Sequence, residues 1–361
     1  MKQGQENFEK LWEKLQAERA GARDYIANTR KLKFETKEEG GGNSTLFMEE
    51  APNTFSSFGV SELAHRQLAD RLKIPFKYYE QMRTKQPALL DINVNTWLHE
   101  QPENRMIRTL FGNVRAFLSD RYQRIDNLEL AYRIVKVMGE NQHWAVGSCE
   151  VTDTRLYVKV VSDKLKTEVV PGDVVQAGFV VSNSEVGLGS VKIEPLVYRL
   201  VCKNGLIVQD RVHQRYHVGQ RCVEGEYGQE LYREETIKTD QKAYFMKVED
   251  ILRGALDREL FENTVERMRA AKTKRLDADP VEAVKLLGEA YKFTEAETMQ
   301  VGAHFLQEND YSHYGLVNAV TRTSQDIEDY NRATEFEKFG GQLLNGGIDF
   351  IVRNISARKV G

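Results

Sequence analysis

The stretch RMIRTLFGNVRAFLSDRYQRIDN, residues 105–127, is the most basic and most strand-like run of the chain. Its pattern predicts a β-hairpin in which five arginines are interleaved with aromatic residues, namely Arg105, Arg108, Arg115, Arg121 and Arg124 with Phe111, Phe117 and Tyr122. Such a surface suits a phosphate backbone with unstacked bases, because the charges pair with phosphates and the rings stack on bases. The same spacing also suits an ordinary amphipathic hairpin whose arginines lie in water.

Length and composition indicate a globular protein. The 361 residues allow two domains, or one domain with a helical appendage, and 41% hydrophobic with 29% charged residues is typical of soluble chains. The longest apolar runs, such as Val174 to Val181, are too short to cross a bilayer, and the N-terminus lacks the apolar core of a secretory signal. We therefore expect a cytoplasmic protein with no membrane contact.

The charge is unevenly distributed along the chain. The formal net charge is −3, yet residues 104–221 contain 17 Lys and Arg against 12 Asp and Glu. Any binding to nucleic acid therefore requires a local basic surface, since the whole chain gives no attraction. The three cysteines, Cys149, Cys202 and Cys222, have no paired spacing, so we expect free thiols and no disulfide framework.

Hydrophobic spacing divides the chain into three parts. Residues 1–60 are expected to form a helix over 5–29 and then a strand hairpin around the glycines at 40–42. Residues 61–235 are expected to form an α+β core, in which Ser61 caps a helix that runs to Leu72 and Pro75 opens a second helix. This helical pair resembles a helix-turn-helix in outline, but its second helix has few base-reading residues.

The core is predicted to contain a mainly antiparallel sheet. A helix over 127–141 is expected to pack on strands at 144–150, 155–162, 174–182, 190–202 and 206–208. Residues 236–361 are predicted to be a helical C-terminal region, with Asp279 as a cap before Pro280 and a capping box at Thr294 to Glu297. The fold class is therefore α+β, followed by helices that pack on the sheet or on another subunit.

Few residues form recognised chemical motifs. Ligand types for zinc are supplied by His213 and His217 together with Cys202 and Cys222. The cysteines lack the close spacing of structural zinc sites, so a phosphate contact or simple solvent exposure is the favoured role of the two histidines. Asp120 could bind magnesium with a second aspartate, but pairing with arginine is favoured, and no cofactor is indicated. The helix start at 312–321 is a candidate anion contact or simply a well-capped helix.

Several segments together resemble the phage- and plasmid-associated proteins grouped as domain of unknown function 932. The resemblance covers roughly residues 60–345 and is carried by AFLSDRYQRIDN (116–127), VSNSEVGLGSVKIEPLVYRLVCKNGL (181–206), RVHQRYH (211–217), SHYGLVNAVT (312–321) and ATEFEKFGGQLL (333–344). It implies a mobile-element setting and no agreed catalytic residue. The sequence has Gly205 where the family pattern has threonine, which weakens any special role for a hydroxyl there.

Fold outline and setting together favour a non-enzymatic protein that binds or anneals single-stranded DNA, similar in outline to phage recombination annealers. Its expected partners are single-stranded DNA and further copies of itself, in the cytoplasm of a bacterial host. The expected contact residues are Arg105, Arg108, Arg115, Phe117, Arg121, Tyr122, Arg124, Lys159, Arg199, Lys203, Arg211 and Arg215. One alternative is a metal-dependent nuclease using Asp120, Asp126 and His213. Another is an anti-defence factor whose acidic helices bind a protein.

Overall fold

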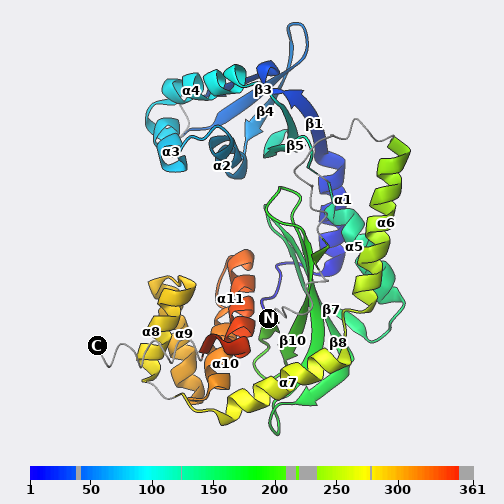
Figure 1. Ribbon diagram of the computed structural model, residues 1–361, viewed down its shortest axis with the longest axis vertical. Helices are drawn as coiled ribbons and strands as arrows, with labels where there is room; N and C mark the ends of the chain where they lie inside the picture. The colour runs from blue at the N-terminus through cyan, green and yellow to red at the C-terminus, as the bar shows by residue number, and fades with distance from the viewer. Residues whose placement is uncertain (38–41, 123, 209–216, 219–233, 277–278, 349–361) are drawn as a thin grey trace.

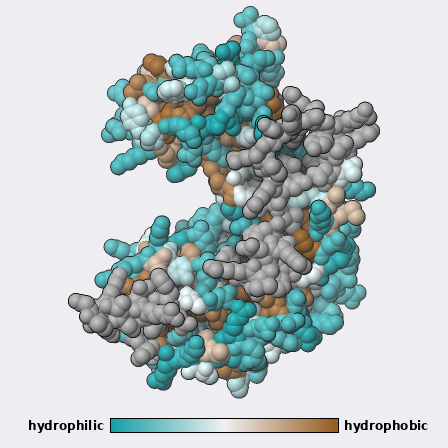
Figure 2. Space-filling view, in the orientation of Figure 1, coloured by the Kyte–Doolittle hydropathy of each residue, from teal (hydrophilic) through white to brown (hydrophobic). Residues whose placement is uncertain are grey.

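The computed structural model describes residues 1–37, 42–122, 124–208, 217–218, 234–276 and 279–348. The described elements form two lobes, each built on its own β-sheet, and a deep indentation separates the lobes on the side away from helix α6 (Figures 1 and 2). Mostly hydrophilic side chains border this indentation (Figure 2).

The first lobe contains a sheet with the strand order β1-β5-β6-β4-β3-β2. The strands are β1 (Ala22–Asn28), β2 (Leu32–Thr36), β3 (Ser44–Ala51), β4 (Thr54–Val60), β5 (Asn104–Leu110) and β6 (Asn113–Ser119). The pairing is antiparallel except between β4 and β6. Three helices complete the lobe and share its apolar core, namely α2 (Glu62–Arg71), α3 (Phe76–Lys85) and α4 (Pro87–Glu100).

The second lobe contains an antiparallel sheet with the order β11-β10-β9-β8-β7, in which β12 also pairs with β10. Its strands are β7 (Trp144–Val151), β8 (Leu156–Glu168), β9 (Val174–Asn183), β10 (Val191–Arg199), β11 (Gly205–Ile207) and β12 (His217–Val218). Three helices share one apolar core with this sheet, namely α1 (Phe8–Gly21), α5 (Asn127–Gly139) and α6 (Glu234–Arg253).

The C-terminal helices share a second apolar core with the same sheet (Figure 1). They are α7 (Arg258–Thr273), α8 (Pro280–Tyr291), α9 (Glu295–Glu308), α10 (His313–Thr323) and α11 (Tyr330–Gln342), followed by a π-helical turn over Leu343–Gly347. Asp279 caps α8 through the N–H groups of Val281 and Glu282, and Thr294 forms the expected capping box with Glu297. The predicted α+β class with a helical C-terminal region is confirmed.

Two expectations for the N-terminal part are wrong. The helix expected over residues 5–29 ends at Gly21, and Ala22–Asn28 form strand β1. Tertiary pairing with β5 decides this segment, because Tyr25 and Ile26 suit a strand as well as they suit a helix. The division expected at residue 60 falls inside the first lobe, since Gly59 and Val60 pair with Asn113 and Val114 in one sheet.

A buried ion pair attaches α11 to the second sheet. Lys159 Nζ on β8 lies 2.7 Å from Glu337 Oε2 on α11, and neither side chain is exposed. The backbone N–H of Lys2 donates to the other carboxylate oxygen of Glu337 over 2.7 Å. Burial lowers the pKa of Lys159, although the nearby Glu337 carboxylate opposes that shift. The pair is therefore a structural connection that requires both partners.

Replacing Glu337 with glutamine should leave the Lys159 ammonium buried without a countercharge. We expect the free energy of unfolding to fall by about 3–5 kcal/mol, since removal of one partner from a buried pair is strongly destabilising. The double variant Lys159→Met, Glu337→Met should recover most of this loss, because two apolar side chains need no countercharge. Urea denaturation measures both values, and an unchanged midpoint in the single variant would contradict this role.

Candidate binding cleft at the lobe junction

The predicted arginine-rich hairpin exists, and it lies inside the first sheet. Strands β5 and β6 pair with each other, and their outer neighbours are β1 and β4. A strand with a neighbour on each side has less exposed surface than an edge strand. Most of the hairpin side chains therefore contact protein, which decides what the arginines can do.

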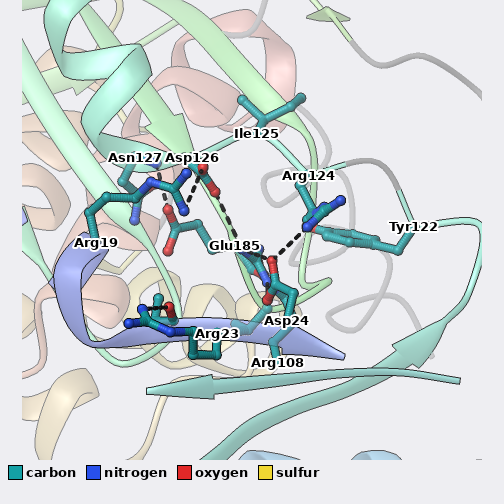
Figure 3. A network of polar contacts seen from close by, with 12 residues as sticks. Arg19, Arg23, Asp24, Arg108, Tyr122, Arg124, Ile125, Asp126, Asn127 and Glu185 are labelled. Carbon is teal, nitrogen blue, oxygen red and sulfur yellow. Dashed lines mark hydrogen bonds and ion pairs between the residues drawn. The ribbon is translucent and has the colours of Figure 1, made fainter. Parts of the chain in front are cut away.

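Arg108 lies at the centre of a polar network between the lobes (Figure 3). Its guanidinium donates to Asp24 on β1 over 2.8 and 3.2 Å, to Asp126 before α5 over 3.3 Å, and to the Glu185 carbonyl over 2.7 Å. The side chain is 1% exposed. Burial opposes its charge, but the hydrogen bonds from Arg108 to Asp24 and the nearby carboxylates raise its pKa. Arg108 therefore connects both lobes as a permanent cation.

Further contacts attach residues 184–188, which connect β9 and β10, to the first lobe. Arg115 on β6 pairs with Glu185 over 2.6 Å, and the other oxygen of Glu185 accepts from the N–H of Asn127 over 2.6 Å. The Tyr122 hydroxyl donates to the Ser184 carbonyl over 2.9 Å, and the Gln67 amide donates to the Val186 carbonyl over 2.8 Å. Contacts from β6, α2 and Tyr122 therefore hold this connection, together with the first N–H of α5.

The structure separates the expected contact residues by exposure. The buried ones are Arg105, Arg108, Phe117 and Lys159, and the half-buried ones are Arg115, Tyr122 and Arg199. The exposed ones are Arg121, Arg124 and Lys203. Two more, Arg211 and Arg215, lie outside the described residues. Four of these residues meet at the lobe junction, namely Arg108, Arg115, Tyr122 and Arg124. Three others lie in the second lobe, namely Lys159, Arg199 and Lys203. The buried members cannot reach a ligand in solvent in this conformation.

Partners explain the burial of several of these side chains. Arg105 pairs with Glu103, and Arg199 donates to Asp173 over 2.6 Å beside the Tyr314 ring. Phe117 lies in the apolar core of the first lobe. A cation that is buried together with a carboxylate partner is not available to a phosphate in solvent. Arg105, Phe117 and Arg199 are therefore engaged within the protein in this conformation.

A cleft of about 860 Å³ opens beside this network. Its walls come from α1, α2, the β5–β6 turn, the β7–β8 turn and the β9–β10 connection. The lining residues include Lys14, Glu18, Glu62, Leu63, Arg66, Leu110, Phe111, Asn113, Arg115, Asp153, Arg155, Glu185, Val186 and Leu188. Both lobes contribute walls, which is typical of ligand sites.

Phe111 is the unusual residue of this cleft. It occupies the β5–β6 turn with φ of +47°, beside Gly112 at +80°, and it is 62% exposed. A bulky residue in the left-handed region is uncommon and strained, and such strain concentrates at functional sites. Its ring lies against Gly21, where an added Cβ would be 2.2 Å from a ring atom. The turn therefore presents an aromatic face at the cleft.

Three cationic side chains of the cleft form no ion pair with a described residue. Arg66 lies over the Phe76 ring at 4.2 Å, Arg155 donates to the Leu188 carbonyl, and Lys14 donates to the Val151 carbonyl over 3.3 Å. Their positive charge is not neutralised by contact, unlike that of Arg115. The cleft thus combines an exposed ring with available cations.

Acidic groups in the cleft differ in how they are compensated. Glu62 pairs with Arg83 over 2.7 Å, and Glu185 pairs with Arg115. Glu18 on α1 has a raised pKa, first because it is partly buried and further because Glu185 and Asp153 carry the same charge nearby. Burial and these like charges therefore disfavour the ionised form of Glu18.

The raised pKa of Glu18 predicts a stabilising substitution. A carboxyl whose folded pKa lies above its ordinary value stabilises the fold at low pH, and this stability is lost as the pH rises through the folded pKa. Glu18→Gln should therefore raise the thermal midpoint at pH 7, with a smaller gain at pH 4. Glu13→Gln, an exposed position on the same helix, is the matched control. Calorimetric melting at both pH values measures the difference, and equal or lower stability at pH 7 would contradict the effect.

The residues proposed for metal chemistry do not converge in the described part of the chain. Asp126 pairs with Arg108 and with Arg19, while Asp120 accepts a hydrogen bond from Ser119. Among the residues that the structure describes, no group of three or more His, Cys, Asp or Glu side chains could hold a metal ion. His213 and Cys222 lie outside them. Asp126 precedes α5 as its N-cap residue, but its side chain binds these arginines and makes no cap hydrogen bond.

Fold and cleft define a two-lobed α+β protein with a charged, aromatic-lined site between its lobes. Residues 115–338 match the family model described as domain of unknown function (DUF932), and the chain belongs to this family. The matched range includes Arg155 and Glu185, whereas Lys14, Arg66 and Phe111 precede it. No curated protein and no solved structure matches the chain. None of the described helices is long and apolar enough to span a membrane.

Proposed function

We propose that this protein binds single-stranded DNA in the cleft at the lobe junction and serves strand annealing in the recombination or replication of a phage or plasmid. The observation that carries the proposal is the exposed Phe111 ring, held in a left-handed turn beside cations that form no ion pair with a described residue. Single-strand sites combine such rings with positive charge.

The chemistry favours a single strand over a duplex. Bases in a duplex are already stacked, so an exposed ring gains contact only with an unpaired base. The cations Lys14, Arg66 and Arg155 come from three different elements around Phe111, and they supply phosphate contacts along a strand. Such contacts are independent of sequence and depend on salt, because each neutralised phosphate releases counterions.

The proposal includes a cellular setting and an assembly. We propose that the protein acts in the cytoplasm of a bacterium that carries the mobile element, the setting that the resemblance noted in the sequence implies. A cleft of this size holds a short segment, so a long strand requires several copies side by side. We therefore include self-association along the strand in the proposal.

Phe111→Gly separates binding from folding. Glycine suits the left-handed turn, so the variant should fold with unchanged or higher stability. Loss of one base-stacking ring should weaken single-strand binding by roughly 5- to 150-fold, since stacking on one aromatic ring contributes about 1–3 kcal/mol. Phe55→Ala is the matched control, because Phe55 is 54% exposed and does not line the cleft.

The measurement is fluorescence anisotropy with single-stranded DNA, duplex DNA and single-stranded RNA at two salt concentrations. Arg66→Gln and Arg155→Gln should each weaken binding and lower the salt slope by about 0.7 per lost phosphate contact. Wild-type affinity in a folded Phe111→Gly variant would refute the cleft as the binding site. Absence of binding to all three nucleic acids would refute the function and favour a protein partner for the helical region.

A further inference from the structure

A second pocket lies next to the Arg108 network and shares no lining residue with the cleft. Its volume is about 500 Å³, and its walls come from the end of α1, strand β1, the start of α5 and helix α6. The lining residues are Arg19, Asp24, Arg124, Asp126, Leu128, Glu129, Arg133, Lys242 and Phe245. None of these nine residues takes part in the nucleic-acid binding proposed for the cleft.

Among the described residues, four cationic and three acidic side chains line this pocket, and the acidic ones are already paired. Asp24 and Asp126 both accept from buried Arg108, and Glu129 pairs with Arg133. Arg19 lies 3.6 Å from Asp126, and Arg124 lies 3.3 Å from Asp24. The side chains of these two arginines remain 59% and 52% exposed. The pocket therefore keeps an excess of positive charge.

Arg19 and Arg124 also have unused hydrogen-bond donors. A guanidinium carries five N–H donors, and among the described residues each of these two arginines contacts one aspartate oxygen. Lys242 is exposed and forms no ion pair with a described residue. Figure 3 shows Arg19 and Arg124 on either side of Asp126. Three cationic groups are thus available to one ligand.

The first turn of α5 adds backbone donors at the same place. A helix leaves its first N–H groups without a partner inside the helix. The N–H of Asn127 donates to Glu185, and that of Leu130 donates to the Asp126 carbonyl. The N-cap residue Asp126 makes no side-chain cap bond to this helix, and Leu128 and Glu129 of its first turn line the pocket. The N–H groups at the start of a helix attract anions.

We propose that this pocket is a phosphate-binding site, in which Arg19, Arg124, Lys242 and the first turn of α5 hold the phosphate oxygens. A phosphomonoester carries about −1.5 to −2 charges and three acceptor oxygens, which matches the excess of cations and the unused donors. The apolar ring of Phe245 provides a wall for the organic part of a phosphate ester. Inorganic phosphate and a nucleoside monophosphate share this chemistry.

Isothermal titration calorimetry with inorganic phosphate and with adenosine monophosphate, at constant ionic strength, tests the site. Wild-type protein should show saturable binding of at least one of them, and the double variant Arg19→Gln, Arg124→Gln should bind more than about 10-fold more weakly. Tighter binding of the nucleotide identifies an ester as the ligand, and equal binding identifies the phosphate group itself. Arg258→Gln, an exposed arginine paired with Glu262 on α7, is the control.

Lys242→Gln is the second variant. Lys242 is exposed and forms no ion pair with a described residue, so its removal should not affect folding, and the affinity of the variant for the same probe should also fall. The absence of saturable heat with both probes, or unchanged affinity in the folded double variant or in Lys242→Gln, would overturn the site. The cleft variant Phe111→Gly should bind phosphate normally. This result separates failure of the phosphate site from failure of single-strand binding.

Discussion

Arg108 is the side chain on which the arrangement of the two lobes depends. Its buried guanidinium joins β1, the start of α5 and the β9–β10 connection, and its opposite partner across the β1–β5 pair is Asp24. A small cavity lined by Arg108, Arg115 and Glu185 lies between the cleft and the second pocket. The network thus holds the walls of both candidate sites, and a buried charge of this kind requires all of its partners.

The local parts of the fold were predictable from the sequence. Ser61 before an apolar helical stretch, Asp279 before a proline, and Thr294 with a glutamate three residues later are capping signals, and each one caps the expected helix. The alternation of apolar residues likewise predicted the strands of the second sheet. The first strand was missed because residues 22–28 become a strand through pairing with β5, which lies about eighty residues away.

The site was less predictable, because exposure depends on long-range partners. The hairpin predicts arginines beside rings, but Asp24 and Glu185, which neutralise Arg108 and Arg115, carry no local signal of that role. Within the hairpin, Phe117 points into the core while Phe111 occupies the turn. The position of a glycine directly after Phe111, between two strand-like runs, was the one signal that could have identified the exposed ring.

Arg108 and Arg115 of the hairpin hold the lobes together, whereas the β5–β6 turn and its neighbouring cations form the proposed contact with a nucleic-acid strand. Photo-crosslinking to a single-stranded oligonucleotide with 5-bromodeoxyuridine, followed by mass spectrometry of the peptides, tests this separation most directly. The account predicts the main adduct on Phe111 or its neighbours in the β5–β6 turn. Adducts confined to peptides that do not line the cleft, such as those of helices α7 to α10, would contradict it.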